Sequence, residues 1–304
     1  MTALTFDIGG SSVKVAVIEG GVQPRITARP FDPIPLQRRH IDELRRIVLS
    51  TTAAALLDGP PIDRIAISTT GIVDTEEVVI DSGFITGYVR TSWAQTLEQS
   101  FPGRFEVVHV ANDGDCAAWA EFVRGARESD SLAHFVLGTG LGGAAITGAQ
   151  IVADPPGRAG NFGHVPVPAK ERATCVCGDD RCAEAFAAAR GVLSSAPRGA
   201  MTIRDLSARV MSGDRASRAA FATAGKWLGY AIAEVASTLK IQTVTIGGGL
   251  ALAARTPEEN VYVQAASTTA QELTASSVQV LESRLGNDGG LLGAAALAHR
   301  AQAA

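Results

Sequence analysis

A short apolar run near the N-terminus, Ala3-Leu4-Thr5-Phe6, leads into the sequence Asp7-Ile8-Gly9-Gly10-Ser11-Ser12-Val13-Lys14. The pattern predicts a buried strand that ends in a carboxylate and then turns through two glycines. Glycines allow the bare backbone amides of such a turn to face an anion. Asp7 would suit a water molecule on Mg²⁺, which prefers carboxylates and substrate phosphates. An ordinary hairpin turn without a ligand is the alternative, because short glycine motifs are unspecific.

This opening pattern has an echo later in the chain. Phe6-Asp7-Ile8-Gly9 and the returning Val15-Ala16-Val17 resemble Phe135-Val136-Leu137-Gly138 and Ala144-Ala145-Ile146, 129 residues later. Each copy predicts a strand, a glycine turn and a returning strand. We therefore expect two related α/β domains, 1–115 and 116–288, with a hinge near Asp115 and a last helix, 289–304, that completes the first domain.

Composition excludes several classes of protein. The 304 residues are 46% hydrophobic and 19% charged, as in a globular chain, and the formal net charge of −4 disfavours a nucleic-acid partner. The most apolar long segment, 221–239, is interrupted by Lys226 and Glu234, which predicts a buried helix and not a membrane span. No signal peptide is recognisable. We expect a cytoplasmic protein without a membrane or nucleic-acid partner.

The remaining pattern predicts alternating strands and helices. Strands are expected at 62–68, 77–80, 105–111 and 242–246, and helices at 116–124, 183–193, 203–210, 221–239 and 289–301. A glycine turn at Gly71 follows the first of these strands. The last helix is expected to pack back on the first half.

Three glycine clusters each follow an apolar run, and they are Gly9-Gly10, Gly138-Thr139-Gly140 and Gly247-Gly248-Gly249. Small-residue turns on two lobes could offer amides to the oxygens of a nucleoside triphosphate, and Thr139 could add a hydroxyl. Tight turns without a ligand are the alternative.

A histidine and three cysteines have the composition of a zinc site. They are His164, Cys175, Cys177 and Cys182. Three thiolates and one imidazole complete a tetrahedron around Zn²⁺ and leave no position open, which is typical of a structural site. Cysteines buried as small hydrophobic residues are the alternative, but 174–181 is polar. Cys116 lies in an apolar helix start and is expected in the core.

Asn112-Asp113 stands where a predicted strand ends and a helix begins. Ligands gather at the carboxyl ends of strands in open α/β sheets. Asp113 could therefore be a general base or a metal ligand, or it could cap the helix, which is the commoner role of an Asp before an apolar helix.

Taken together, these motifs resemble the ROK family of bacterial sugar kinases and sugar-responsive repressors. The sequences 7–14 and 137–143 are similar to its two phosphate motifs, and Asn112-Asp113 to its catalytic pair. The run 175–184 matches its zinc motif, while 246–249 and 289–295 resemble its C-terminal nucleotide segments. Three positions depart from the family pattern: Ala111 replaces Glu, Asp115 replaces Asn, and Asn161 replaces the Glu of the Gly-Glu-x-Gly-His signature. The sugar-binding stretch also differs at 82–88 and retains Trp93.

The resemblance implies an actin-like ATPase (ribonuclease H-like) fold, with two α/β domains around a cleft that holds sugar and ATP. It implies that Asp113 is the catalytic base and that zinc on His164 and the three cysteines orders the sugar loop. The expected sugar-binding residues are Gly71, Asn112, Asp113, Asn161, His164 and Glu184. The residues expected to bind nucleotide and Mg²⁺ are Asp7, Gly9, Gly10, Ser11, Lys14, Gly138, Thr139, Gly140, Gly247, Gly248 and Gly249.

These expectations favour an ATP- and Mg²⁺-dependent kinase, glucokinase-like, that phosphorylates the primary 6-hydroxyl of a hexose or hexose derivative. We expect a homodimer. A ROK protein that binds sugar with little or no kinase activity is the alternative, suggested by Asn161 and the altered sugar stretch. The repressor branch is disfavoured because only six residues precede Asp7. An amide at position 161 would suit a sugar that carries an acceptor near its anomeric end or 2-position.

Overall fold

A computed structural model describes residues 2–82, 85–124, 129–153, 160–197, 202–274 and 278–303. The chain divides into two compact units, of which the first comprises Met1–Gly125, Ala153–Ala159 and Asp288–Ala304, and the second Ala126–Val152 and Gly160–Asn287. The predicted domain bounds stay a prediction. The loop Pro155-Pro156-Gly157, and positions 83 and 84 of the altered sugar stretch, lie outside the described residues.

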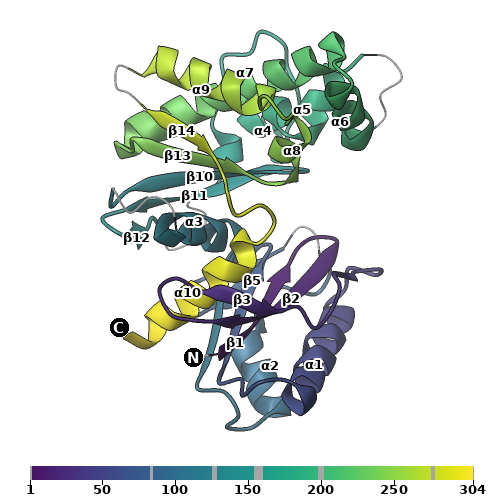
Figure 1. The fold of residues 1–304 in the computed structure, drawn as a ribbon, viewed down its shortest axis with the longest axis vertical. Helices are drawn as coiled ribbons and strands as arrows, with labels where there is room; N and C mark the ends of the chain where they lie inside the picture. Colours follow the sequence, from purple (N-terminus) through teal and green to yellow (C-terminus); the bar gives the residue numbers. More distant parts are fainter. Residues whose placement is uncertain are drawn as a thin grey trace. The chain divides into compact units, whose positions relative to one another are not determined.

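The first unit is built on a mixed sheet with the strand order β3-β2-β1-β5-β9 (Figure 1). These strands are β1 (Thr2–Ile8), β2 (Ser12–Glu19), β3 (Arg25–Ala28), β5 (Arg64–Thr69) and β9 (Val107–Asn112), and β4 (Ile34–Pro35) also pairs with β2. Strands β1 and β2 form the predicted antiparallel hairpin, whereas β1, β5 and β9 run parallel. Every residue of β5 is buried, as expected for a central parallel strand.

The helices of the first unit are α1 (Ile41–Asp58), α2 (Trp93–Ser100), α3 (Asp113–Arg124) and α10 (Gly289–Ala303). Helix α10 packs on α3, β5 and β9. Its approach to α3 depends on Gly293, because a Cβ there would collide with the carbonyl oxygen of Cys116. Cys116 is fully buried, as predicted.

A small antiparallel sheet completes the described part of this unit. It consists of β6 (Ile72–Val73), β7 (Val78–Asp81) and β8 (Thr91–Ser92), with β7 in the middle. Gly71 leads from β5 into this sheet with a φ of 98°, and a Cβ at Gly71 would collide with the carbonyl oxygen of Asp81. Glycine is therefore required at this turn.

The second unit repeats the hairpin arrangement. Its sheet has the order β12-β11-β10-β13-β14, with β10 (Leu132–Leu137), β11 (Leu141–Thr147), β12 (Gln150–Ile151), β13 (Thr243–Gly247) and β14 (Gln279–Glu282). Strands β10 and β11 are antiparallel, and β10, β13 and β14 are parallel. The predicted echo of the first hairpin is confirmed.

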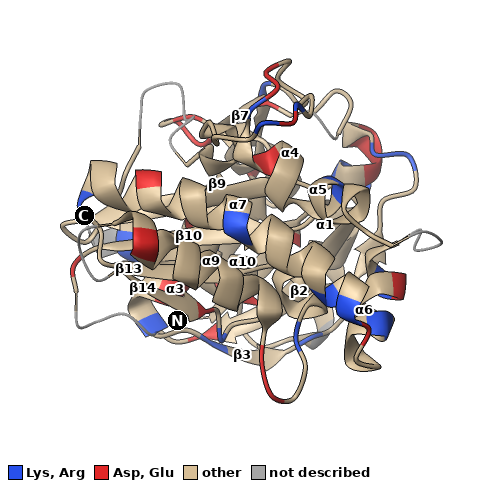
Figure 2. Cartoon of the chain, turned by 90° about the horizontal axis from the view of Figure 1, so that it is seen from above, with Lys and Arg blue, Asp and Glu red and all other residues tan. Residues whose placement is uncertain are grey.

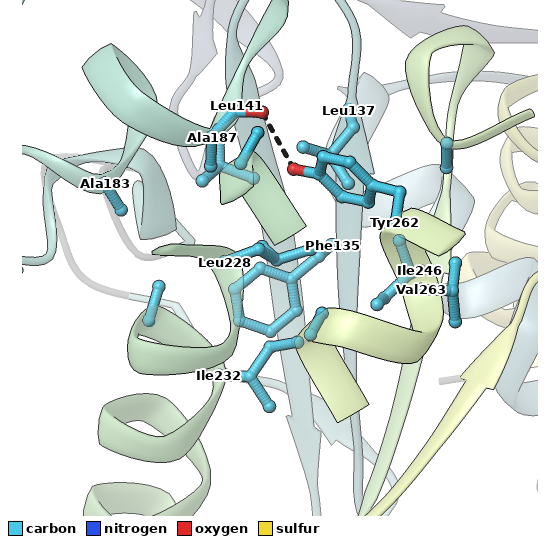
Figure 3. Close-up of a cluster of buried hydrophobic side chains, with 14 of the residues drawn as sticks. Phe135, Leu137, Leu141, Ala183, Ala187, Leu228, Ile232, Ile246, Tyr262 and Val263 are labelled. Atoms are coloured by element: carbon cyan, nitrogen blue, oxygen red, sulfur yellow. Dashed lines mark hydrogen bonds between the residues drawn. The ribbon is translucent and has the colours of Figure 1, made fainter. Parts of the chain in front are cut away.

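Helices pack on this second sheet around an apolar core. They are η1 (Phe162–His164), α4 (Ala183–Ala187), α5 (Ala189–Ser194), α6 (Ile203–Met211), α7 (Arg215–Leu239), α8 (Gly249–Ala253) and α9 (Val261–Leu273). Figure 3 shows Phe135 of β10 among Leu228, Ile232 and other apolar side chains. The buried hydroxyl of Tyr262 donates to the carbonyl of Ala187 at 2.8 Å, which satisfies the polar groups inside this core (Figure 3).

Two predicted helices differ most from the structure, while α3 begins at Asp113, three residues before the predicted start at 116. The segment 183–193 forms two short helices, because Ala188 between them is extended. The helix predicted at 221–239 begins at Arg215, since the Asp214 carboxylate accepts the amide hydrogen of Ser217 at 2.7 Å and caps it. That helix, α7, carries charged side chains of both signs along its length (Figure 2). Among the described residues no helix has the length and apolar character needed to cross a membrane.

Candidate active site and metal centre

The parallel register of the first unit brings several predicted site residues to one edge of the sheet. Asp7 of β1 pairs with Ser68 of β5, and Thr69 pairs with Asn112 of β9. The strand ends therefore align Asp7, the turn at Gly71 and Asn112-Asp113. This is the carboxyl edge at which parallel sheets bind ligands.

Asp7 is held by groups of its own unit. Its Oδ2 lies 2.8 Å from Lys14 Nζ, and its Oδ1 accepts the Ser68 hydroxyl at 2.9 Å. Gly290 of α10 lies so close that an added Cβ would be 2.7 Å from Oδ1. Sequence reasoning missed Ser68, although its place at the end of a strand parallel to the Asp7 strand was a usable signal.

Asn112 connects three backbone groups. Its Nδ2 donates to the carbonyl of Gly71 at 2.8 Å, and its Oδ1 accepts the amides of Gly114 at 2.8 Å and Asp115 at 3.3 Å. Asn112 thus provides the side-chain cap of α3. The Gly114 amide also donates to Asp113 Oδ1, at 2.9 Å. The capping role that the sequence left open for Asp113 is performed by its neighbour.

Asp113 has an unusual electrostatic environment. Burial, followed by the negative charge of Asp7, raises the pKa of Asp113 to about 7. Burial and the charge of Asp113 also raise the pKa of Asp115 to about 7. A carboxyl group that titrates near neutral pH is suited to accept a proton during a reaction. Asp115 is therefore a second carboxyl group at this strand end that titrates near neutral pH.

Two glycine turns lie at one edge of the second sheet. The turn Gly138–Gly140 connects β10 to β11, and Gly247–Gly249 leads from β13 into α8. Val136 pairs with Gly247, so the two turns follow adjacent parallel strands. Gly248 has a φ of 94° and packs on the backbone of Leu137, where a side chain would collide. Gly138 and Gly249 face open space, so packing alone does not require glycine there.

Some turn amides are already used within the protein. The Gly9 amide donates to the carbonyl of Ser12 at 3.0 Å, and the Gly138 amide donates to the carbonyl of Gly140 at 3.0 Å. These bonds shape the two hairpin turns. An anion at either turn would therefore have to use other donors, among which Ser11 and Thr139 are exposed.

The four predicted metal ligands come together in the second unit. Their ligand atoms all lie within 4.8 Å of one another, with Cys175 Sγ 3.6 Å from His164 Nδ1 and Cys177 Sγ 3.5 Å from Cys182 Sγ. Bonds of about 2.0–2.3 Å to a central Zn²⁺ require separations of this size. Three thiols and one imidazole at this spacing fit a structural zinc site.

Glu184 links this cluster to the glycine turn. Its Oε2 accepts the Leu141 amide at 3.0 Å, directly after Gly140, and its Oε1 lies 3.5 Å from Cys175 Sγ. A Cβ at Gly140 would lie 2.7 Å from Glu184 Oε2. Both carboxylate oxygens therefore have partners within the second unit.

Asn161 and Trp93 have contrasting environments. Asn161 precedes η1, where its carbonyl accepts the His164 amide at 3.0 Å while its side chain is exposed and makes no capping bond. Trp93 is fully buried, and its Nε1 donates to the Tyr88 hydroxyl at 2.9 Å. The Tyr88 hydroxyl lies 2.7 Å from the Thr69 hydroxyl at the end of β5. Trp93 therefore supports the strand end from inside the core.

We predict one zinc ion per chain on His164, Cys175, Cys177 and Cys182. Because a structural site contributes folding energy directly, Cys177→Ser should lower both the zinc content and the melting temperature. Val176→Ser is the matched control, since Val176 is 88% exposed between two ligands. Elemental analysis of protein purified without chelator checks the prediction, and well under one zinc per chain would contradict it.

Burial of Asp113 should reduce stability at neutral pH. Between about pH 4 and pH 7 the folded chain keeps the proton of Asp113, because its pKa is raised from 3.8 to about 7. The unfolded chain has released this proton over the same pH range. The unfolding free energy therefore falls as pH rises through this window. Asp113→Asn should add about 1–3 kcal/mol of stability near pH 8, with a gain that shrinks toward pH 4. Ligand-free thermal melts across this range check it, and an equal or negative effect at all pH values would contradict it.

Comparison with known proteins agrees with this geometry. The family model described as "ROK family" matches residues 4–301. The chain is 30% identical over 304 residues to the N-acetylmannosamine kinase of Escherichia coli K12, covering 98% of each chain.

Solved structures show the same fold. The ROK hexokinase from Thermus thermophilus matches with a TM-score of 0.79 and 24% identity, over 100% of this chain and 99% of that one. The ROK family glucokinase from Streptomyces griseus, in complex with glucose and AMPPNP, matches with a TM-score of 0.81 and 23% identity, over 99% of this chain and 100% of that one. The predicted α/β, actin-like ATPase fold is confirmed. The chain belongs to the ROK family.

Proposed function

We propose that this protein is an ATP- and Mg²⁺-dependent sugar kinase that transfers the γ-phosphoryl group to the primary 6-hydroxyl of a hexose derivative. The observation that carries the proposal is Asp113, a half-buried carboxyl at a strand end whose pKa is raised to about 7. Its neighbour Asn112 binds the carbonyl of Gly71 and the amide of Gly114, the residue that follows Asp113. The names of the relatives support the proposal, since they are an N-acetylmannosamine kinase, a hexokinase and a glucokinase.

In the proposed reaction, the sugar hydroxyl oxygen attacks the γ-phosphorus, its proton moves to Asp113, and ADP leaves. Phosphoryl transfer requires mainly positioning and charge stabilisation from the protein. Asn112 would orient the sugar, and Asp7 would hold a water molecule on Mg²⁺. The free amides of the glycine turns and the Thr139 hydroxyl would bind phosphate oxygens.

The substrate that we favour carries a hydrogen-bond acceptor near its anomeric end, as the acetamido carbonyl of N-acetylmannosamine does. The supporting feature is Asn161, an exposed amide next to His164. A carboxylate only accepts hydrogen bonds, whereas an amide also donates them. His164 would bind the metal through Nδ1, which leaves Nε2 for a sugar hydroxyl. Glu184 would contact the sugar through the remaining acceptor capacity of its two carboxylate oxygens, each of which has one partner within the second unit.

A sugar-binding protein without kinase activity is the second candidate, and Asn161 is the observation that favours it. ADP release measured across a panel of hexoses and N-acetylhexosamines separates the two. A kinase releases ADP in a sugar-dependent way, whereas a binding protein shows sugar affinity in calorimetry without ADP release.

Asp113→Asn should abolish most phosphorylation while sugar still binds, because removal of a general base typically costs about 10²–10⁴-fold in rate. In the wild type, kcat/KM should rise with pH through a midpoint near 7, where Asp113 loses its proton. Stopped assays over pH check both outcomes. Near wild-type turnover of Asp113→Asn would show that Asp113 is not the base.

Asn161→Glu should shift specificity toward unmodified glucose. A charge-assisted hydrogen bond is worth roughly 1.5–3 kcal/mol, which corresponds to about a ten- to hundredfold change in affinity. The measurement is the ratio of kcat/KM for glucose to kcat/KM for N-acetylmannosamine, with Asn161→Gln as the control that keeps the amide. An unchanged ratio in Asn161→Glu would remove position 161 from the specificity determinants.

A further inference from the structure

The turn between β6 and β7 is tightly organised and presents a carboxylate to the main sheet. The Asp74 carboxylate accepts the amides of Glu76 and Val78, both at 2.9 Å, and backbone bonds join Asp74 to Glu77 and Val78. Glu77 has a φ of 60°, in the left-handed region that is uncommon for residues with side chains. Glycine would adopt this conformation more easily, so the contacts of the Glu77 side chain are of interest.

Both oxygens of the Glu77 carboxylate bind β9. Oε1 lies 2.7 Å from His109 Nδ1, and Oε2 accepts the Val110 amide at 2.8 Å. Strand β9 ends the strand order of its sheet, with β5 as its neighbour on one side. Glu77 therefore occupies backbone hydrogen-bonding capacity of an edge strand.

The His109 ring favours one arrangement of protons. Among the described residues, its buried Nε2 has no hydrogen-bond partner. A ring that carries a proton on Nδ1 donates it to the Glu77 carboxylate. The side chain of His109 is 15% exposed, so water does little to replace these bonds.

The same segment is attached to β9 at a second point. Gly71, which leads into β6, accepts the Asn112 side-chain amide through its carbonyl at 2.8 Å. Asn112 lies three residues beyond His109 and caps the helix that begins with Asp113. The β6–β7 hairpin is thus held to β9 at its turn by Glu77 and at its base by Gly71.

We propose that Glu77 and His109 are positioning residues that fix the β6–β7 hairpin on β9 and thereby place Gly71, Asn112 and Asp113 for the sugar. This inference rests on the proposed function, because it assigns the consequence to sugar binding and transfer. His109 is separated from Asp113 along the chain by Val110, Ala111 and Asn112, so Glu77 and His109 act through the hairpin and the strand.

The test is the kinetic effect of Glu77→Ala. We expect the KM for sugar to rise roughly tenfold, the loss equivalent to about one buried hydrogen bond, while the KM for ATP stays unchanged. A purely structural role would lower the melting temperature and the active fraction, and would leave both KM values unchanged. That second pattern would overturn the proposal.

Matched variants separate the pair from general damage. Glu76→Ala is the control for a lost charge in the same turn, since Glu76 is exposed, and it should behave as wild type. His109→Phe keeps a ring and removes the donor, so it should raise the sugar KM. His109→Asn places an amide donor near the position of Nδ1, so its sugar KM should stay close to the wild-type value. The double variant Glu77→Ala/His109→Phe should be no worse than the more affected single variant. Additive effects would contradict a shared role.

Hydrogen exchange gives a readout that does not depend on kinase activity. In Glu77→Ala the Val110 amide should exchange faster, because its acceptor is gone, while amides of the β1–β5 ladder keep their protection. Unchanged exchange at Val110 would refute the attachment itself. Absence of ADP release in the wild type, together with faster exchange in the variant, would refute the proposed kinase function and leave the attachment standing.

Discussion

Asp7 and Asp113 repel each other at the carboxyl edge of the first sheet, and the arrangement of the first unit around them compensates this repulsion. Parallel pairing of β1, β5 and β9 forces the two carboxylates together. Lys14 and Ser68 stabilise the charge of Asp7, and the desolvated Asp113 keeps its proton to about pH 7. A site that concentrates negative charge in this way is prepared for a cation and for a proton transfer, at a cost to the stability of the free protein.

The second unit uses the same hairpin for a different purpose. Its turn carries no carboxylate corresponding to Asp7, since Val136 and Leu137 follow Phe135 where Asp7 and Ile8 follow Phe6 in the first copy. The carboxylate here comes from Glu184, which reaches the turn from the helix after the cysteine cluster. Glycine at 140 and 163 gives Glu184 the room that it needs. The metal ligands and the glycine turn are therefore one connected structure and not two separate motifs.

Sequence reasoning predicted what is local and repeated. The correct predictions concern short segments, in which the residue pattern alone indicates the local geometry. They are both hairpins, the ligand cluster and the strand-to-helix junction at Asn112-Asp113. Sequence reasoning failed where contacts join segments that are far apart in the chain. The hydrogen bond from Glu77 to His109 spans 32 residues, and the one from Ser68 to Asp7 spans 61. A local sequence pattern therefore predicts neither of these two bonds. Trp93 shows a second limit, because a motif match indicates a residue type and not whether its side chain faces a ligand or the core.

The order of Asn112 and Asp113 follows from what each side chain must do. Position 112 donates to the Gly71 carbonyl and accepts from the amides that begin α3, and a side-chain amide does this with two separate atoms. A carboxylate there would face the Gly71 carbonyl without a proton to share. In the proposed reaction, position 113 needs an acceptor whose protonation changes near neutral pH, which an amide cannot offer. Asn112 therefore makes the hydrogen bonds that hold the strand end, and the carboxyl of Asp113 is available for the proposed proton transfer.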